Sequence, residues 1–293
     1  MSAVDPPLCG APRSPTRSPA TTLPAGACDC HLHIFDSNHP MVRGRKYTPP
    51  AASLSSYIEL QKTLGLERAV VVQPSVYGTD NSVTLNAVRA GGDSFRAVVV
   101  VEPDAPLQTL CTMREKGARG VRINPLFDSN ARTNSVLLFA SRLAELNWHV
   151  QYLLDVSSIG DLVALAGRLP VPVVFDHFGH LPVDKGVHNP GFQSLLRLVG
   201  DGRAWVKLSG AYRITGNAHT PYADVLPFVK ALINANPERL LWGSDWPHPH
   251  IPVSMPDDTN LLDMMLQWLP DSTLRQQIFV DNPAKLYGFT HDD

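Results

Sequence analysis

The chain is organised around the stretch Leu241-Trp242-Gly243-Ser244-Asp245-Trp246-Pro247-His248-Pro249-His250. Its first residues continue a short apolar run that is typical of the end of a buried strand, and Gly243 is expected to let the backbone turn. Asp245 follows two residues later. A carboxylate at the end of a buried strand is costly to desolvate unless it has a partner or a chemical task. Asp245 is therefore the first candidate for a catalytic residue.

A second motif, His31-Leu32-His33, lies near the other end of the chain. Residues two apart in an extended segment face the same way, so the two imidazoles are expected to point together. If the first and the last strand close one barrel, these histidines and Asp245 share a site.

Composition limits the classes of function. The chain has 293 residues, 44% of them hydrophobic and 18% charged, with a formal net charge of -2. This length suits one α/β barrel domain, and the charge gives no reason to expect nucleic acid as a partner. No run approaches the length of a transmembrane helix. The four cysteines lack zinc-type or C-x-x-C spacing, which favours free thiols in a cytoplasmic protein.

The first 24 residues are rich in Pro, Ser, Thr and Ala and lack the apolar core of a secretory signal. We expect residues 1–24 to be a disordered tail and residues 25–293 to form a single domain.

Short apolar runs alternate with amphipathic stretches along that domain. Continuous apolar strands between helices indicate parallel pairing with both faces of the sheet covered. Eight such units predict an α/β fold of the closed (β/α)8 TIM-type barrel, and no Gly-x-Gly-x-x-Gly follows the first strand to support a dinucleotide fold. The expected strands are residues 27–35, 68–73, 95–101, 119–124, 148–154, 172–177, 204–209 and 239–242.

Polar side chains stand at the carboxyl ends of these strands, where barrel enzymes carry their chemistry. They are His31, His33, Ser75, Arg122, Tyr152, His177, Arg213 and Asp245. Imidazoles can donate hydrogen bonds to a carbonyl oxygen that gains negative charge. Asp245 can accept a proton from an attacking water. Arginines can bind carboxylates through paired N–H donors. The two arginines predict an anionic small molecule as substrate.

Three segments also resemble a known family: Cys30-His31-Leu32-His33-Ile34-Phe35-Asp36, Asp176-His177-Phe178-Gly179 and Trp242-Gly243-Ser244-Asp245-Trp246-Pro247-His248-Pro249. They are similar to the amidohydrolase superfamily, and within it to the 2-pyrone-4,6-dicarboxylate lactonases. The resemblance implies hydrolysis of a cyclic ester without a required metal, with Asp245 activating water and His31, His33 and His177 polarising the lactone carbonyl. It also implies that the substrate is bound by Tyr47, Ser75, Arg122, Tyr152, Arg213 and His248.

One departure from that pattern concerns the loop after the fourth strand. The lactonases have a second basic residue soon after the strand-four arginine, whereas here Asn124-Pro125-Leu126-Phe127-Asp128 follows. Either Arg132 substitutes for that residue, or one carboxylate contact is missing. The second case favours a sulfonated muconolactone or a sugar-acid lactone. Asp245 favours hydrolysis, because the similar lactone isomerases have a neutral residue there.

The sequence is compatible with a metal-free site and with a zinc site. His31, His33, His177 and Asp245 could hold one zinc ion, and a zinc-dependent lactonase or decarboxylase is the alternative to metal-free hydrolysis. A catalytically silent binding module would explain the arginines but leave Asp245 and the histidines without a task. The oligomeric state is not indicated.

Overall fold

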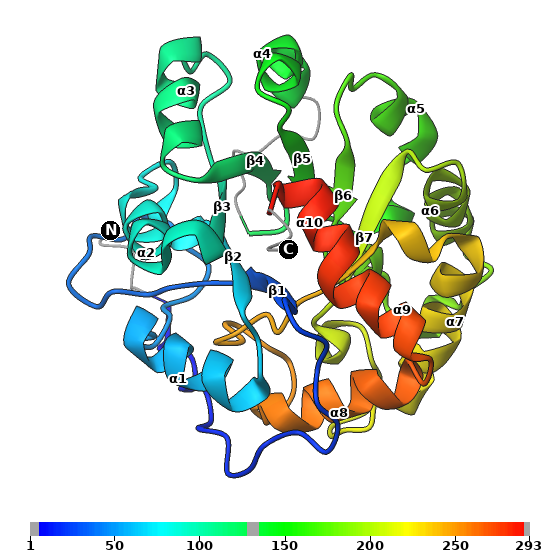
Figure 1. The fold of residues 1–293 in the computed structure, drawn as a ribbon. Coiled ribbons are helices and arrows are strands. Elements are labelled where there is room, and N and C mark those ends of the chain that lie inside the picture. The colour runs from blue at the N-terminus through cyan, green and yellow to red at the C-terminus, as the bar shows by residue number, and fades with distance from the viewer. Residues whose placement is uncertain (1–5, 128–134, 290–293) are drawn as a thin grey trace.

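The computed structural model describes residues 6–127 and 135–289. Eight parallel strands pair in sequence order and form a (β/α)8 barrel, as predicted (Figure 1). They are β1 (Cys28–Leu32), β2 (Arg68–Val72), β3 (Phe95–Val99), β4 (Ala118–Ile123), β5 (His149–Tyr152), β6 (Val173–Phe175), β7 (Ala204–Leu208) and β8 (Leu240–Trp242). Each is shorter than the run that predicted it or equal to it in length, because the strand ends turn into loops that carry polar residues.

Helices cover the outside of the barrel. They are α1 (Leu54–Leu64), α2 (Ser82–Gly91), α3 (Leu107–Glu115), α4 (Ala140–Glu145), α5 (Leu162–Gly167), α6 (Pro190–Gly200), α7 (Leu226–Ala235), α8 (Asp258–Trp268), α9 (Ser272–Gln276) and α10 (Asn282–Tyr287). A π-helical turn, Gln277–Asp281, separates α9 from α10. None of the helices in the described ranges combines the length and the apolar character that a membrane span requires.

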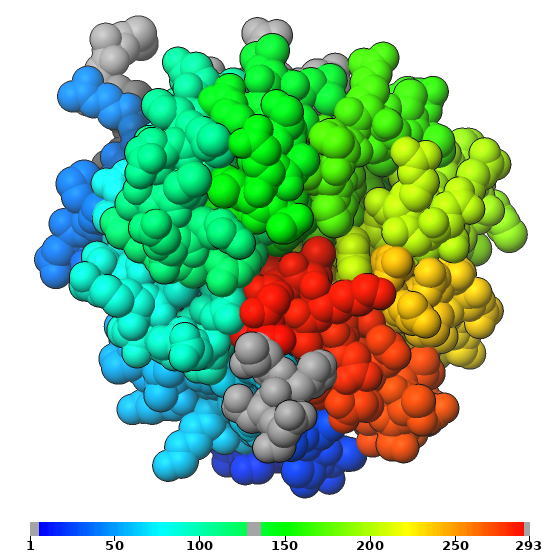
Figure 2. Space-filling view, turned by 45° about the horizontal axis from the view of Figure 1, so that its top comes forward, coloured from blue at the N-terminus to red at the C-terminus, as the bar shows by residue number. Residues whose placement is uncertain are grey.

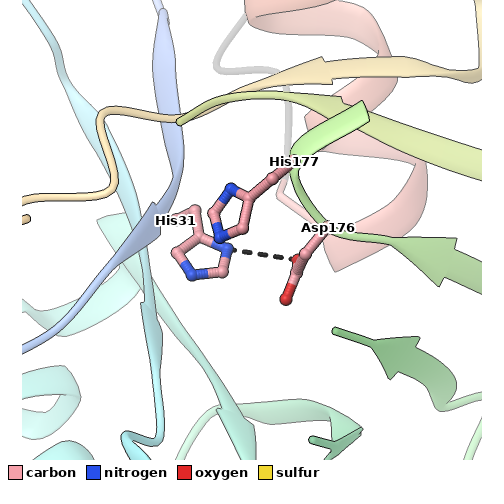
Figure 3. Close-up of side chains that lie close together, drawn as sticks. All are labelled: His31, Asp176 and His177. Atoms are coloured by element: carbon pink, nitrogen blue, oxygen red, sulfur yellow. Dashed lines mark ion pairs between the residues drawn. The ribbon is translucent and has the colours of Figure 1, made fainter. Parts of the chain in front are cut away.

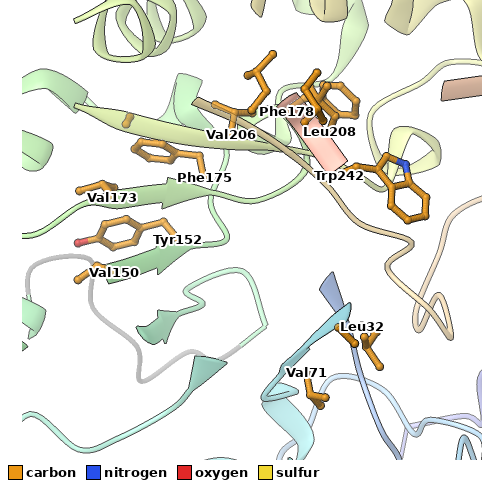
Figure 4. Close-up of a cluster of buried hydrophobic side chains, with 14 of the residues drawn as sticks. Leu32, Val71, Val150, Tyr152, Val173, Phe175, Phe178, Val206, Leu208 and Trp242 are labelled. Carbon is orange, nitrogen blue, oxygen red and sulfur yellow. The ribbon is translucent and has the colours of Figure 1, made fainter. Parts of the chain in front are cut away.

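Two apolar clusters stabilise the barrel. The larger lies between the strands and the helices, where Val150, Tyr152, Val173 and Phe175 pack together (Figure 4). The smaller fills the barrel interior with side chains such as Cys30, Val70, Val98 and Leu241, and α10 closes its amino-terminal end with Tyr287. Figure 2 shows this C-terminal segment (red) in the middle of that face.

The barrel closes through the residues that follow β8. Asp245 N donates to His31 O (2.8 Å), and His33 N donates to Trp246 O (2.8 Å). A Cβ at Gly243 would lie 2.7 Å from His31 Cβ, so glycine is required here by close approach rather than by a turn. Closure therefore places the two histidines beside Asp245.

Asp29 strengthens the same junction. Its two carboxylate oxygens accept hydrogen bonds from Ser244 N (2.9 Å), Ser244 Oγ (2.6 Å) and Tyr57 OH (3.2 Å). Burial raises the pKa of Asp29 to about 6, although these donors oppose the rise. A buried carboxylate with this many donors holds the first strand to the last.

Residues 6–24 differ from the expected disordered tail. Cys9 N donates to Thr48 O (2.8 Å), and Thr48 Oγ1 donates to Pro6 O (2.6 Å). Further along, Arg17 pairs with Asp263 of α8 (2.6 Å). Composition alone predicts disorder here, but backbone hydrogen bonds and this ion pair attach the segment to the barrel.

Candidate active site

Asp245 lies at the centre of the polar cluster at the carboxyl ends of the strands. It is fully buried, with φ of 63°, a left-handed backbone conformation that non-glycine residues rarely adopt outside functional sites. Its Oδ2 accepts from Arg213 Nε (2.6 Å) and Tyr212 OH (2.7 Å). Burial opposes ionisation, but the positive charge of the Arg213 guanidinium holds the pKa of Asp245 well below its usual value. The carboxylate is therefore ionised at neutral pH.

The other oxygen of Asp245 faces three imidazoles. Asp245 Oδ1 lies 3.7 Å from His31 Nε2, 3.8 Å from His33 Nε2 and 3.9 Å from His177 Nε2. Both Asp245 Oδ1 and His31 Nε2 are buried without a hydrogen-bond partner. Buried polar atoms are nearly always paired, so these two unpaired atoms indicate a place for a ligand, a water or an ion.

His33 has a defined hydrogen-bonding state. Its Nδ1 lies 2.7 Å from Val72 O, which can only accept, so Nδ1 carries the proton. Burial and the positive charge of Arg122 lower the pKa of His33 to about 4. The neutral ring therefore directs the lone pair of Nε2 toward Asp245.

His31 rests on a buried layer of charged side chains. Its Nδ1 lies 3.2 Å from Asp176 Oδ1 (Figure 3) and 3.3 Å from Lys207 Nζ. Lys207 also donates to Gln151 Oε1 (2.7 Å), and Arg122 Nη2 donates to Asp176 Oδ2 (3.3 Å). Burial, followed by the charge of Lys207, lowers the pKa of His31 well below its ordinary value. His31 is thus a neutral ring.

A one-residue irregularity in β1 helps to place His31. Asp29 pairs with Ala69 and Leu32 with Val71, so three steps along β1 match two along β2. An extra residue of this kind re-aims the side chains beside it. Cys30 joins the interior cluster while His31 reaches the polar layer above it.

His177 reaches the site from the turn after β6. Its φ is 49°, and its Nδ1 lies 2.9 Å from Ser209 Oγ at the end of β7. A Cβ at Gly210 would lie 2.9 Å from His177 Nδ1, so glycine at this position leaves room for the ring. Burial lowers the pKa of His177 well below its ordinary value, against the opposing charge of Asp245.

A pocket opens above Asp245. Most of the residues that the sequence predicted for the site line it, namely His33, Tyr47, Ser75, Arg122, His177, Arg213 and Asp245. His31 lies behind them, fully buried. Asn124, Phe127, Leu153 and Pro249 complete the lining and were not predicted. The site is therefore assembled from all around the barrel.

Two predicted substrate-binding residues, Tyr152 and His248, lie outside the lining of this pocket. Tyr152 faces the opposite side of β5 from Gln151 and stacks on Phe175, with ring centroids 6.1 Å apart. His248 lies behind Asp245, between Tyr212 OH (2.7 Å) and Asp258 (3.1 Å). Arg132 lies outside the described residues.

Arg213 lines the pocket, but its main partner differs from the prediction. Sequence reasoning assigned it to a substrate carboxylate, whereas its Nε is bound to Asp245 and its Nη2 donates to Pro249 O (3.1 Å). Its first effect is therefore on the carboxylate of Asp245.

Several polar residues of the site were missed by sequence reasoning. Lys207 could have been found, since it is a lone charge inside the apolar run Ala-Trp-Val-Lys-Leu of β7. Asp176 precedes the predicted His177 and could have been assigned with it. Tyr212 gave no signal, because one tyrosine in a loop is usually a packing residue.

The described residues could hold a metal ion. His31, His33 and Asp245 form one group of suitable donor atoms, and His31, Asp176 and His177 form a second. The unpaired His31 Nε2 and Asp245 Oδ1 fit a single divalent cation held by three imidazoles and one carboxylate. The cations Arg213 and Lys207 lie within hydrogen-bonding distance of these ligands and oppose the binding of a further positive charge.

Comparisons with known proteins identify the family. Residues 28–289 match the amidohydrolase family model. The chain is 37% identical over 289 residues to a 4-sulfomuconolactone hydrolase of Hydrogenophaga intermedia, covering 96% of this chain and 95% of the relative. It is 36% identical over 285 residues to a 2-pyrone-4,6-dicarboxylate hydrolase of Comamonas testosteroni, covering 92% of each.

A solved structure of a putative 2-pyrone-4,6-dicarboxylic acid hydrolase from Pseudomonas putida superimposes with a TM-score of 0.81 at 32% identity. The superposition covers 92% of this chain and all of that one (100%). The family model, the relatives and the fold confirm the resemblance carried by the three motifs: the chain belongs to the amidohydrolase family.

Proposed function

We propose that the protein is a lactone hydrolase that opens the ring of an anionic cyclic ester. The observation that carries this proposal is that the Nε2 atoms of three imidazoles lie 3.7–3.9 Å from Asp245 Oδ1, which has no hydrogen-bond partner. These residues lie beneath a pocket that Arg122 also lines. The lactone-hydrolase names of the relatives support the same reaction class.

His33 and Asp245 together suit the nucleophilic water. Both His33 Nε2 and Asp245 Oδ1 are hydrogen-bond acceptors, and they lie 3.8 Å apart. A water molecule between two acceptors at this separation can donate one proton to each. Asp245 then takes the proton as the water oxygen attacks the ester carbon.

His31 and His177 suit the carbonyl oxygen. Lys207 donates to His31 Nδ1 and Ser209 can donate to His177 Nδ1, which leaves both Nε2 atoms able to carry protons. Two such donors stabilise the negative charge that develops on the carbonyl oxygen. The four central residues thus divide into a pair that activates water and a pair that polarises the ester.

Arg122 is the proposed contact for an anionic group of the substrate. Its Nε is buried without a partner, although its Nη1 and Nη2 are engaged. Tyr47 and Ser75, which hydrogen-bond to each other, can add neutral contacts at the same wall. Arg132 stays a proposal for the same task.

The first candidate substrate is 2-pyrone-4,6-dicarboxylate. A sulfonated muconolactone is the second, because Arg213 is bound to Asp245, which leaves Arg122 as the cation available to an anionic group among the described residues that line the pocket. The ionised Asp245 favours hydrolysis over isomerisation.

We propose that hydrolysis needs no metal, with a single zinc at His31, His33, His177 and Asp245 as the alternative. Such an ion would supply Lewis acidity and an activated water. For it to bind, His31 Nδ1 must donate to Asp176, a state that the adjacent ammonium of Lys207 opposes. We also propose a cytoplasmic location, which suits the four free thiols.

The test is an assay of purified protein on both lactones before and after exhaustive chelation, with metal content measured in each sample. Activity on at least one anionic lactone that survives chelation supports the proposal. If metal-free protein is inactive and stoichiometric zinc restores turnover, the zinc alternative holds. If neither form opens any anionic lactone, the proposed function is wrong.

A further inference from the structure

We propose that His248 and Asp258 are positioning residues that fix the carboxylate of Asp245 through the hydroxyl of Tyr212. The inference deepens, and rests on, the lactone-hydrolase function proposed above. It concerns a chain of four buried side chains that runs from the site toward the start of α8.

The chain is continuous and shielded from solvent. Tyr212 OH donates to Asp245 Oδ2 (2.7 Å) and also lies 2.7 Å from His248 Nδ1. His248 Nε2 lies 3.1 Å from Asp258 Oδ1. None of the four side chains is more than 2% exposed.

The direction of each hydrogen bond follows from counting protons. Tyr212 has one hydroxyl proton and two neighbours, and the ionised Asp245 can only accept. The proton must point to Asp245, because two oxygens with facing lone pairs would otherwise stand 2.7 Å apart. His248 Nδ1 must then carry a proton and donate it to the oxygen of Tyr212.

The far end of the chain sets the orientation of the ring. With Nδ1 donating to Tyr212, the contact of His248 Nε2 with Asp258 Oδ1 is favourable only if a proton lies between them. Asp258 stands in the first turn of α8, where a helix favours negative charge. The contact with Asp258 Oδ1 (3.1 Å) holds the ring of His248 with Nδ1 facing the hydroxyl of Tyr212 (2.7 Å).

The consequence for Asp245 is that its two oxygens become unequal. Oδ2 accepts two hydrogen bonds, from Arg213 and Tyr212, whereas Oδ1 has none and faces the three imidazoles. His248, acting through Tyr212, thus adds to Arg213 in holding Oδ2 and leaving Oδ1 available as the base. If the hydrogen bond from His248 is lost, the Tyr212 hydroxyl is free to rotate away from Asp245. Asp245 Oδ2 then loses one of its two hydrogen bonds.

A double-mutant cycle tests this coupling. Tyr212→Phe and His248→Gln are each expected to lower kcat on an anionic lactone by about tenfold to a hundredfold, the scale of one hydrogen bond to a charged group. KM is expected to stay within about twofold, since neither residue lines the pocket. The double variant should be no slower than Tyr212→Phe, because His248 acts only through that hydroxyl.

Two variants serve as matched controls. His248→Asn places an amide N–H near the position of Nδ1 and is expected to retain more activity than His248→Gln, whose amide lies near the position of Nε2. Asp257→Ala removes the neighbouring carboxylate that caps α8 through Asn260 N but does not touch the chain, so its kcat is expected to match the parent. Melting temperatures show whether each variant is folded.

Three results would overturn the inference. They are unchanged kcat in folded His248→Gln, losses that multiply in the double variant, or an effect on KM alone. A crystal structure of His248→Gln gives a readout other than turnover, and an unchanged 2.7 Å contact between Tyr212 OH and Asp245 Oδ2 would also contradict it. If the parent protein opens no lactone, the proposed function fails, and that crystal structure still decides the inference.

Discussion

Arg213 Nε and Asp245 Oδ2 lie 2.6 Å apart, and both side chains are almost completely buried. This pair explains how a carboxylate can stay ionised at the end of a buried strand. A guanidinium with a permanent charge offsets the desolvation of Asp245 and occupies the oxygen that faces away from the imidazoles.

Arg213→Met is therefore expected to act on turnover rather than on substrate selection. Loss of the partner of a buried charge should lower kcat by about tenfold to a thousandfold and by similar factors on charged and neutral lactones. Steady-state kinetics on one lactone of each kind provide the measurement. A loss confined to the charged lactone would instead assign Arg213 to the substrate, as the sequence first indicated.

Arg122→Met is expected to show the opposite pattern. Arg122 lines the pocket and carries a permanent positive charge, so KM for a dianionic lactone should rise by about tenfold or more while a neutral lactone is affected less. The same two substrates serve as the comparison. Equal losses on both would assign Arg122 to support of Asp176, with which it also pairs.

The sequence predicted the fold and the centre of the site because both have strong local signals. Apolar runs at regular intervals indicate parallel strands, and His31, His33, His177 and Asp245 directly follow or end such runs. The carboxyl ends of parallel strands lie at one end of a barrel, so the convergence of these residues follows from the fold class.

The remaining wrong predictions concern the direction in which a side chain points and the residue with which it pairs. Sequence patterns contain little information about either. In β5 the polar His149 and Gln151 alternate with Val150 and Tyr152, but alternation alone does not show which of the two faces of the strand is turned to the barrel interior. The pairings of Arg213 with Asp245 and of His248 with Tyr212 depend on loops whose paths no periodicity describes.

The N-terminal segment offers a test of the fold. Deletion of residues 1–22 should lower the melting temperature and raise KM, because this segment bonds to Thr48, the neighbour of the pocket residue Tyr47. A chain that begins at Pro6 keeps every one of these contacts and serves as the control, and Arg17→Ala alone should cost less than about 1 kcal/mol as a surface ion pair. Unchanged melting temperature and KM in the long deletion would show that residues 6–22 contribute nothing.

Stability is expected to fall as the pH is lowered from about 7 to 5. Burial depresses the pKa of His33 and His180 to about 4 and of His149 to about 3, and that of His31 and His177 also lies well below the ordinary value. The unfolded chain therefore binds more protons than the folded chain between the unfolded pKa of about 6.5 and these folded values. Each histidine can contribute up to about 1.4 kcal/mol per pH unit in that window. Asp29, whose pKa is raised to about 6, stabilises the folded protein as the pH falls, but it is a single group against five histidines.

Urea unfolding at pH 7.5, 6.0 and 5.0 measures this dependence, and His149→Leu provides a variant with one such histidine fewer outside the pocket. The free energy of unfolding of this variant should depend less steeply on pH than that of the parent protein. Equal stability at all three pH values would show that the buried histidines do not remain neutral.

The most direct test of the proposed mechanism is the turnover of Asp245→Asn on an anionic lactone that the parent protein opens. Asparagine keeps the shape of the side chain and an oxygen for Arg213 and Tyr212, but it cannot take a proton from water. We predict that kcat falls by about two to four orders of magnitude, the usual scale for loss of a general base, while the melting temperature shows a folded protein. Turnover near that of the parent in a folded Asp245→Asn variant would contradict the assignment of Asp245 as the base that activates water.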